Sequence, residues 1–567
     1  MGKHLLSISL CFLIAAFSIT SSCNRVEVGY DILITNGRII DGTGNPWFYG
    51  DIGINGDTIA EMGDLSGKTA TKTFDAQGLV VSPGFIDIHS HTDFSIKDNP
   101  EAESKVMQGI TTEVVGMCGF SPAPTNGNYF NDLMDYFTNT IILSKEEKLQ
   151  WRWKNLYEFY EEIEKKGISV NLAPLLGYGT LRVAYSGFSK TPNALLPEQQ
   201  KKILYQIEKE MEAGIWGIST ALEYPPCSYC DVEEIVKACK IAKRFNGIYS
   251  THMRNEHRKK VFTSLEEAIK VAQISGVNLE IAHLKVAFKE GWGKASEILN
   301  RIHQERKRGI EINADQYPYT AWGSSILDFL PKNIVYKGIN YWRNYLSIKE
   351  NRKEIIRFIK NNLEGPEKGM GWEGVIIANT KTKNNEVIVG KSMHELSIIR
   401  KMEPEELIID LLIEKEGYVK LIVFCMKEED VKTILKDPLV MVGSDGRAVS
   451  PHGKFSKIHY HPRYYGTFPR ILGKYVREEK VISLAEAIRK MTFMPASKIG
   501  LKDRGQITEG AFADIVIFNP HSIIDNATFV NPQRFPSGIK EVLVNGKIVV
   551  EGGKLTSALP GKFLRRK

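Results

Sequence analysis

The stretch FIDIHSHTDF, residues 85–94, decides which fold the chain can adopt. It joins a short apolar run to two histidines, His89 and His91, followed by Asp93. In an extended strand, side chains two residues apart point to the same face, so both imidazoles lie on one side of the chain. Metal-competent groups that follow a buried strand are typical of the C-terminal face of a (β/α)8 barrel.

Further apolar runs of strand length follow this stretch, and helical patterns separate many of them. The eight runs are FIDIHSH (85–91), TTEVVGMCG (111–119), SVNLAPLLGYG (169–179), WGISTAL (216–222), IYSTHM (248–253), LEIAHL (279–284), IEINADQ (310–316) and VMVGSD (440–445). Strands that alternate with helices predict an α/β fold, here a (β/α)8 barrel of the TIM type.

Two of the intervening segments show how the helices are predicted. In residues 196–214, Ile203, Ile207 and Met211 recur every four residues, which indicates a helix that ends before Gly214. The segment SLEEAIKVAQISG, residues 264–276, begins with a serine followed three residues later by a glutamate, the pattern of a capping box. A second helix is therefore predicted to start at Ser264.

The two ends of the chain have a different pattern. Short β segments occur in residues 30–80 and again in residues 513–553, and Asn36-Gly37 and Asn545-Gly546 are typical of hairpin turns. We therefore predict one small β-sandwich domain from residues 28–82 plus 497–567, and a barrel from residues 83–496. The long stretch 322–437 is predicted to be an insertion between the last two barrel strands, where it would cover the pocket as a lid.

Composition excludes some classes of function. Of the 567 residues 43% are hydrophobic and 25% charged, which is ordinary for a globular protein. The net charge is only +7 and the basic residues are scattered, so nucleic acid is not an expected partner.

The N-terminal segment MGKHLLSISLCFLIAAFSITSSC, residues 1–23, is typical of a secretory signal. A basic start at Lys3 precedes an apolar stretch and small residues that end at Cys23. The small residues suggest a bacterial lipoprotein with lipid on Cys23, although Thr20 stands where leucine is usual. A plain signal peptide or an uncleaved anchor are the alternatives. We expect export to the periplasm or cell envelope, with membrane contact only through this anchor.

The remaining cysteines are odd in number, so they cannot all pair with one another in an oxidising compartment. They are Cys118, Cys227, Cys230, Cys239 and Cys425. The CSYC motif at 227–230 is compatible with a disulfide or a redox pair, but no second CxxC follows it. We interpret it as structural or incidental.

The polar residues at the predicted strand ends form a set suited to zinc. They are His89, His91, Cys118, His252, His283 and Asp445. Each is weak by itself, because paired histidines occur on surface strands and a lone buried cysteine is usually a small hydrophobe. Imidazole, thiolate and carboxylate at one end of one barrel are, however, the ligands that Zn²⁺ prefers. The sequence therefore predicts a metal site.

The order of these residues resembles the amidohydrolase superfamily, and more closely its N-acyl-D-amino-acid deacylases, or D-aminoacylases. The similar stretches run from about residue 30 to the C-terminus. They include SPGFIDIHSHTD, QGITTEVVGMCGFSPAP, LLGYGTLR, EAGIWGISTALEYPP, YSTHMRNE, IAHLKV, ADQYPYTA, VGSDG, HPRYYGTFPRILGKYVRE and PASKIGLKDRGQITEGAFADIVIFNP. The cysteine in VVGMCGFSP carries most weight, because most amidohydrolases bridge their metals with a carboxylated lysine instead.

The resemblance implies a role for each matching residue. Cys118, His252 and His283 correspond to tightly held zinc ligands, and His89 and His91 to a weaker second metal position. Asp445 corresponds to the catalytic acid/base, and Arg463 to the arginine that binds the substrate carboxylate. Lys285, Tyr319 and Ser325 correspond to its helpers. The implied reaction is zinc-dependent hydrolysis of small N-acyl-D-amino acids.

One position departs from the family, and two other functions stay open. Tyr178 stands where the family usually has histidine, which would alter the leaving side of the pocket or the acyl specificity. A cyclic-amide hydrolase of the dihydroorotase or hydantoinase type lacks the HPRYYGTFPR stretch, and a peptide-binding lipoprotein without catalysis would not need Asp445. The sequence predicts neither the preferred side chain nor the oligomeric state.

Overall fold

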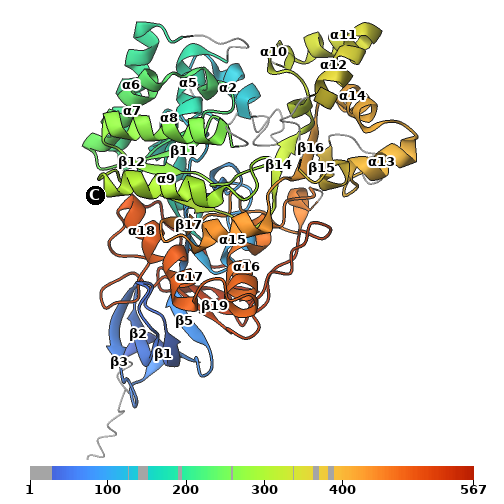
Figure 1. Ribbon diagram of the computed structural model, residues 1–567. Coiled ribbons are helices and arrows are strands. Elements are labelled where there is room, and N and C mark those ends of the chain that lie inside the picture. The colour runs from blue at the N-terminus through green and yellow to red at the C-terminus, as the bar shows by residue number, and fades with distance from the viewer. Residues whose placement is uncertain are drawn as a thin grey trace, which may run out of the picture.

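The computed structural model describes residues 29–125, 127–137, 151–188, 194–256, 260–335, 337–361, 369–380, 388–456 and 458–566. The predicted signal segment lies outside the described residues. A ring of parallel strands, a sheet from the two chain ends and a separate lobe make up this part of the chain (Figure 1). In the described residues, no helix has the length and apolarity needed to cross a bilayer.

Parallel pairings link the eight predicted runs into a ring. The strands are β6 (Phe85–Asp87), β7 (Ile110–Val115), β8 (Asn171–Pro174), β9 (Leu176–Gly177), β10 (Gly217–Ala221), β11 (Ile248–His252), β12 (Asn278–Ile281), β13 (Ile312–Gln316) and β17 (Val440–Val442). They pair in the orders β6-β7-β8 and β9-β10-β11-β12-β13-β17, and Leu175 alone separates β8 from β9. A parallel bridge between Ser90 and Gly446 connects the chain after β6 with the chain after β17. The mixed α/β class is therefore confirmed.

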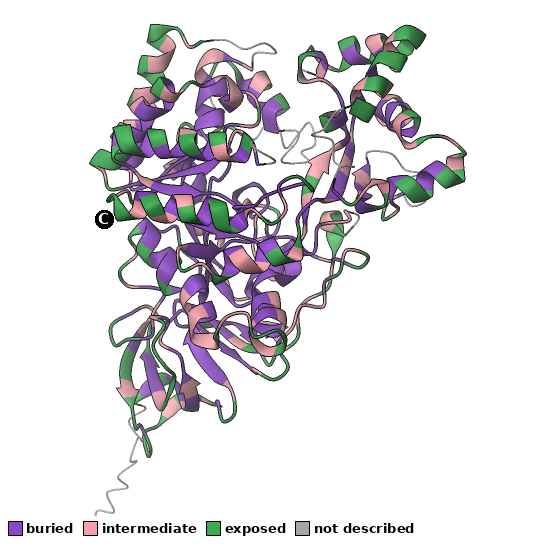
Figure 2. Ribbon diagram, viewed as in Figure 1, coloured by how far each residue is buried: buried purple, intermediate pink, exposed green. Residues whose placement is uncertain are grey.

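Helices alternate with the strands of the ring. They include α4 (Leu156–Lys166), α5 (Tyr178–Ser186), α6 (Pro197–Glu212), α7 (Val232–Arg244), α8 (Lys260–Ser275), α9 (Ala295–Lys307) and α15 (Glu428–Lys436). In Figure 2, α6, α7, α8 and α9 carry exposed outer faces, whereas the strands between them are buried. In α6, Ile203, Ile207 and Met211 are fully buried, as their spacing predicts.

Helix α8 begins four residues before the predicted capping box. Val261 and Leu265, one helical turn apart, are both buried, so the apolar face extends upstream and takes the helix with it. Ser264 therefore lies inside the helix, and Glu267 pairs with Arg254 at 2.8 Å. The predicted end before Gly276 is correct, since α8 ends at Ser275.

Both ends of the chain contribute to a single sheet. Its order is β21-β20-β19-β18-β5-β1-β2-β3, with β4 beside β1. The strands are β1 (Tyr30–Ile39), β2 (Phe48–Asn55), β3 (Thr58–Gly63), β4 (Ala70–Asp75), β5 (Val80–Pro83), β18 (Ile515–Phe518), β19 (Ile539–Val544), β20 (Lys547–Glu551) and β21 (Lys554–Leu555). Asn545-Gly546 joins β19 to β20 with φ angles of 48° and 69°, so this hairpin is confirmed.

The hairpin predicted at Asn36-Gly37 is wrong. Strand β1 continues through these residues, and its register with β2 shifts between Ile34 and Gly37, which is a β-bulge. Asn36 adopts φ 57° and its backbone N–H donates to Asp51 Oδ1 at 2.9 Å. A side chain thus accepts the bond that the bulge removes from the ladder, and the chain does not need to turn.

The last residues of the chain leave this sheet and return to the ring. Isolated bridges join Ile168 to Pro560 and Leu172 to Phe563, beside the starts of the ring strands. Leu564 is buried in one cluster with Trp216 and Met441. The tail therefore differs from the predicted division at residue 497, because it packs at the end of the ring opposite the histidines.

The predicted insertion forms the lobe that extends from the ring beside β14 and β16 (Figure 1). Its strands β14 (Ala321–Ser325), β15 (Val375–Thr380) and β16 (Val419–Phe424) pair antiparallel in the order β14-β16-β15. The lobe also holds α10 (Lys332–Val335), α11 (Ile339–Ser347), α12 (Lys349–Asn361), α13 (Met393–Arg400) and α14 (Pro404–Glu414). Helix α15 packs against α9 and β17, so it belongs to the ring and the insertion ends before it.

Candidate metal centre

The six predicted metal and acid residues converge at the C-terminal ends of the ring strands. His252 is the last residue of β11, and the others follow their strands by two to four residues. Cross-strand bonds fix these ends to one another: the Asp445 N–H donates to the His89 carbonyl at 2.9 Å, and the His91 N–H donates to the Gly446 carbonyl at 2.8 Å. The segments after β6 and β17, which carry His89, His91 and Asp445, are therefore joined directly to each other.

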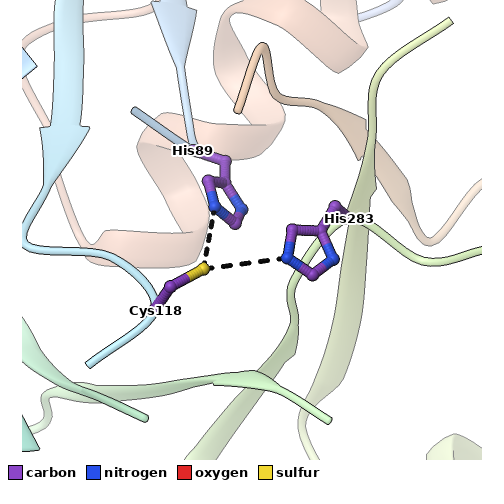
Figure 3. A group of neighbouring side chains, drawn as sticks. All are labelled: His89, Cys118 and His283. Atoms are coloured by element: carbon purple, nitrogen blue, oxygen red, sulfur yellow. Dashed lines mark hydrogen bonds between the residues drawn. The ribbon is translucent and has the colours of Figure 1, made fainter. Parts of the chain in front are cut away.

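Three imidazole nitrogens surround the Cys118 sulfur, and Figure 3 shows two of them, those of His89 and His283. The distances from Sγ are 3.4 Å to His89 Nε2, 3.7 Å to His283 Nε2 and 4.0 Å to His252 Nδ1. In a tetrahedral zinc site with ordinary bond lengths, sulfur and nitrogen ligands are about 3.6 Å apart. The His89 and His283 distances are close to this value, and the ligand atoms of His89, Cys118 and His283 all lie within 4.8 Å of one another, whereas His252 is slightly farther from the sulfur. His89, which the resemblance assigns to the second position, lies nearest to the sulfur.

A second group joins the two histidines of the opening stretch to Asp445. Asp445 Oδ1 lies 3.3 Å from His91 Nε2 and 3.7 Å from His89 Nε2. Its other oxygen, Oδ2, lies 3.0 Å from Arg463 Nη2. The His89, His91 and Asp445 ligand atoms all lie within 4.8 Å of one another, so they too could hold an ion. His89 belongs to both groups and connects them.

The backbone is strained at three of these residues. Cys118, His283 and Asp445 have φ angles of 52°, 37° and 45°, in the left-handed region that side chains other than glycine rarely adopt. Each follows the end of a strand, where the chain turns away from the ring. The turn directs the functional side chain inward over the ring rather than along the strand.

Each of the three histidines near Cys118 has a carboxylate at its other ring nitrogen. Asp315 Oδ2 lies 3.1 Å from His89 Nδ1, Glu223 Oε2 lies 2.9 Å from His252 Nε2, and Glu256 Oε1 lies 2.9 Å from His283 Nδ1. Such carboxylates fix the tautomer and the orientation of metal-binding histidines. Sequence reasoning missed all three, although Glu223 follows β10 by two residues and Asp315 is the next-to-last residue of β13.

Electrostatics favour the charged forms of the key groups. Burial alone would raise the pKa of the Cys118 thiol, but His89, His252 and His283 hold it well below its usual range. Burial would likewise raise the pKa of the Asp445 carboxyl, yet Arg463 and the histidines keep it well below its usual range. Burial opposes the charged form of His252, but Glu256 and Cys118 raise its pKa to about 10. A thiolate and a carboxylate are the forms that bind metal and accept protons.

Arg463 and Lys285 lie at the site as predicted, with Tyr317 between them. The Arg463 guanidinium carbon is 4.6 Å from the Tyr317 ring centroid, and Lys285 Nζ is 5.9 Å from it. Arg463 is buried, and its Nε and Nη1 have no hydrogen-bond partner among the described residues. These donors are therefore available to a bound anion. Tyr317 was not predicted, although it stands in the same YPY motif as Tyr319.

Tyr319 and Ser325, predicted as helpers of Arg463 in substrate binding, both have polar groups with contacts inside the protein. The Tyr319 hydroxyl lies 3.5 Å from Asp525 Oδ2, and its ring packs under the Arg470 guanidinium at 4.7 Å. The Ser325 hydroxyl accepts from the Leu327 N–H at 3.3 Å and caps a 3-10 turn. Both hydroxyls thus make structural contacts, and among the described residues neither forms a hydrogen bond with the predicted metal or acid residues.

Tyr178 and the CSYC motif share a separate buried cluster. The Tyr178 hydroxyl donates to Glu234 Oε1 at 3.0 Å, and Arg182 Nε donates to the same oxygen at 3.0 Å. Cys230 Sγ also contacts this oxygen, at 3.2 Å, and both cysteines of the motif are free thiols. The hydroxyl of Tyr178 is therefore committed to a structural contact, not to the metal pocket as expected.

Comparison with known proteins agrees with this geometry. A family model described as an amidohydrolase family matches residues 398–550. The D-aminoacylase of Alcaligenes xylosoxydans xylosoxydans is 32% identical over 540 residues, which cover 95% of this chain and 98% of that protein.

Solved structures of similar proteins extend over nearly the whole chain. The N-acyl-D-glutamate deacylase of Bordetella bronchiseptica, solved with zinc and a phosphonate inhibitor, has a TM-score of 0.76 and 28% identity, covering 94% of this chain and 99% of that one. A D-aminoacylase structure that concerns a binuclear metal centre has a TM-score of 0.75 and 30% identity, covering 95% of this chain and 100% of that one. The chain therefore belongs to the D-aminoacylase family of the amidohydrolases.

Proposed function

We propose that this protein hydrolyses the amide bond of N-acyl-D-amino acids and releases a carboxylate and a free D-amino acid. The arrangement of Cys118 with three imidazole nitrogens, next to the Asp445–Arg463 pair, carries the proposal. The ring of parallel strands would be a (β/α)8 barrel that holds this site at its C-terminal face. The sheet from both chain ends and the lobe would be additions to that barrel.

Zinc is the metal that the ligand set fits best. Cys118, His283 and His252 would hold it, with His89 at the shared position between this site and His91 and Asp445. When bound, zinc would polarise the amide carbonyl as a Lewis acid and make the attacking water more acidic. A thiolate and neutral imidazoles also favour zinc over magnesium or calcium, which prefer oxygen ligands.

Asp445 would move the proton during the reaction. Its carboxylate takes a proton from the water that attacks the carbonyl carbon, and a new C–O bond forms. As the C–N bond breaks, the same oxygen delivers that proton to the leaving nitrogen. Asp445 is suited to both steps because Arg463 and the histidines hold its pKa well below its usual range, and because it lies beside the metal ligands.

Arg463 would bind the α-carboxylate of the substrate. A guanidinium holds a carboxylate with two parallel hydrogen bonds, and stacking on Tyr317 keeps its plane fixed. When the carboxylate and the amide carbonyl are both held, only one direction remains for the side chain on Cα. This selects one hand, and the D preference follows from the family.

The protein would work outside the cytoplasm. The signal-like segment ending at Cys23 supports export, and lipid on this cysteine would keep the enzyme at the cell envelope. Radiolabelled palmitate on the full chain, and its loss in Cys23→Ala, would support the anchor; an unlabelled full chain would contradict it.

The test of the activity joins metal analysis to a substrate panel. The signal-free protein is purified, its zinc content measured, and N-acetyl amino acids of both hands are supplied together with dihydropyrimidine rings. We expect about one tightly held zinc per chain and cleavage of D forms only. Cleavage of the rings alone would favour a cyclic-amide hydrolase, and a protein that binds no zinc would contradict the metal site.

A further inference from the structure

Glu256 is a buried carboxylate for which the reaction above has no role. It follows β11, four residues beyond His252, and only 2% of its surface is exposed. Taking a carboxylate out of water is unfavourable unless charged or hydrogen-bonding partners replace the lost water. The partners of Glu256 therefore show why it is there.

Those partners come from the strand that follows in the ring. Lys285 Nζ donates to Glu256 Oε2 at 2.6 Å, and His283 Nδ1 lies 2.9 Å from Oε1. His252 Nε2 lies 3.8 Å from Oε2. The spacing of His252, Glu256 and His283 is that of an ion site. The Lys285 ammonium is 2.8 Å from His283 Nδ1, however, so the cation at this position is the lysine.

The hydrogens can be assigned from chemistry. His283 turns Nε2 toward Cys118, at 3.7 Å. A neutral imidazole that binds metal through Nε2 carries its hydrogen on Nδ1 and must donate it. An ammonium has only donors, so Lys285 cannot accept this hydrogen. We assign it to Glu256 Oε1, which lies 2.9 Å from Nδ1 and has no other hydrogen-bond partner among the described residues, while Oε2 accepts from Lys285.

We propose that Glu256 is a positioning residue that couples a metal ligand to the lysine of the substrate pocket. One carboxylate orients the His283 ring toward the metal and holds the Lys285 ammonium beside Tyr317. It also neutralises Lys285, which leaves Arg463 as the cation with unpartnered donors. Only the part of the inference that concerns substrate binding by Lys285 rests on the proposed function.

Zinc affinity tests the first half of the proposal. In the full chain without its signal, Glu256→Gln removes the charge at nearly constant shape, and zinc is then removed by competition with a chelator. We expect the affinity to fall about 10- to 100-fold, the usual effect of removing a carboxylate behind a metal-bound histidine. The control is Glu266→Gln on α8, which breaks a surface pair with Arg301 and should leave zinc affinity unchanged.

A double variant keeps the test valid if Glu256→Gln folds poorly. Glu256→Gln with Lys285→Met removes the unpaired ammonium together with its partner, yet His283 still faces a neutral amide in place of the carboxylate. Zinc affinity should stay as low as in the single variant. Wild-type affinity in a folded variant would overturn the proposal. The measurement needs no turnover, so it decides even if N-acyl-D-amino acids prove not to be substrates.

Kinetics test the second half. If Glu256 holds Lys285 for the substrate, Glu256→Gln and Lys285→Met should raise KM by similar factors in zinc-saturated enzyme. The double variant should show no further rise, because the two residues act as one unit. Fully multiplicative effects on KM would show that the lysine acts independently of Glu256, and would overturn this half.

Discussion

At the scale of single residues, a substitution of Asp445 should affect catalysis but not metal binding. Asp445→Asn keeps the shape of the side chain but cannot accept a proton from water. Because a positioned acid/base contributes about 10²–10⁴-fold, kcat should fall by that factor. Zinc content should stay near the wild-type value, since Cys118, His252 and His283 are untouched. Assay and metal analysis of one preparation check both parts, and retained turnover would refute the proton-transfer role.

Arg463 carries a second prediction at this scale. Arg463→Lys keeps the positive charge and loses the planar pair of donors, so substrate binding should weaken. The loss of one charge-assisted hydrogen bond corresponds to about a 10- to 100-fold rise in KM. Arg470→Lys is the matched control, because Arg470 packs on Tyr319 and pairs with Asp525 at 3.1 Å, away from the metal ligands. An equal KM in wild type and Arg463→Lys would show that this arginine does not bind the substrate carboxylate.

Residues could be predicted where the strand position alone fixes them. The six metal and acid residues follow ring strands, so alternation of strands and helices was enough to bring them together. Glu256 and Glu223 could not be found in this way, because their role depends on which histidine nitrogen faces the metal. That Tyr317, and not Tyr319, packs against Arg463 was unpredictable for a similar reason. The two tyrosines are two residues apart, and only packing against Arg470 or Arg463 distinguishes them.

At the scale of secondary-structure elements, Glu210 of α6 gives a prediction about pH. It is buried and accepts the Leu156 N–H at the start of α4, and burial raises its pKa to about 7. Between the unfolded pKa of about 4.5 and 7, the unfolded chain ionises while the folded chain keeps the proton. Ionisation therefore lowers the free energy of the unfolded state more than that of the folded state. As the pH rises, this group lowers the free energy of unfolding by at most about 3 kcal/mol.

Glu210→Gln should remove this loss. Relative to wild type, the variant should gain stability as the pH rises from 5 to 8, measured as the difference between their urea midpoints at each pH. A difference between the variant and the wild type that is the same at every pH does not bear on the prediction, because only the change of this difference with pH reports the ionisation of Glu210. Glu212→Gln, an exposed position of the same helix, should parallel wild type. Parallel curves for Glu210→Gln would mean that Glu210 is already ionised when folded.

Helices and strands could be predicted where the apolar pattern in the sequence extends over the whole element. The α6 pattern satisfied this condition, and so did the eight strand runs. The start of α8 was misplaced because a capping motif is local, whereas buried Val261 extends the helix upstream. Asn36-Gly37 and Asn545-Gly546 have the same turn signal, yet one forms a bulge and the other a hairpin. The difference lies in the strand pairing: β1 pairs with β2 on both sides of Asn36, whereas β19 ends at Val544 and the chain turns back into β20.

At the scale of the whole molecule, the C-terminal tail closes the ring at the end opposite the metal centre. The Leu564 N–H donates to the Leu172 carbonyl at 2.9 Å, and the Leu564 carbonyl accepts from Trp216 Nε1 at 2.8 Å. Its side chain is buried among residues of several ring strands. The chain thus ends by joining elements that are distant in sequence, and no local pattern could predict such a contact.

This placement separates stability from activity. Leu564→Ala leaves a cavity under the ring and should lower the free energy of unfolding by about 2–4 kcal/mol, measured from the urea midpoint. Because the catalytic residues lie at the other ends of the strands, kcat at 25 °C should not change. Lys562→Ala is the control in the same tail: its side chain is 58% exposed and pairs with Glu164 at 3.6 Å, so its effect should be below about 0.5 kcal/mol. A loss of kcat in folded Leu564→Ala would mean that the two ends of the ring are mechanically coupled, and would contradict their assignment to separate roles.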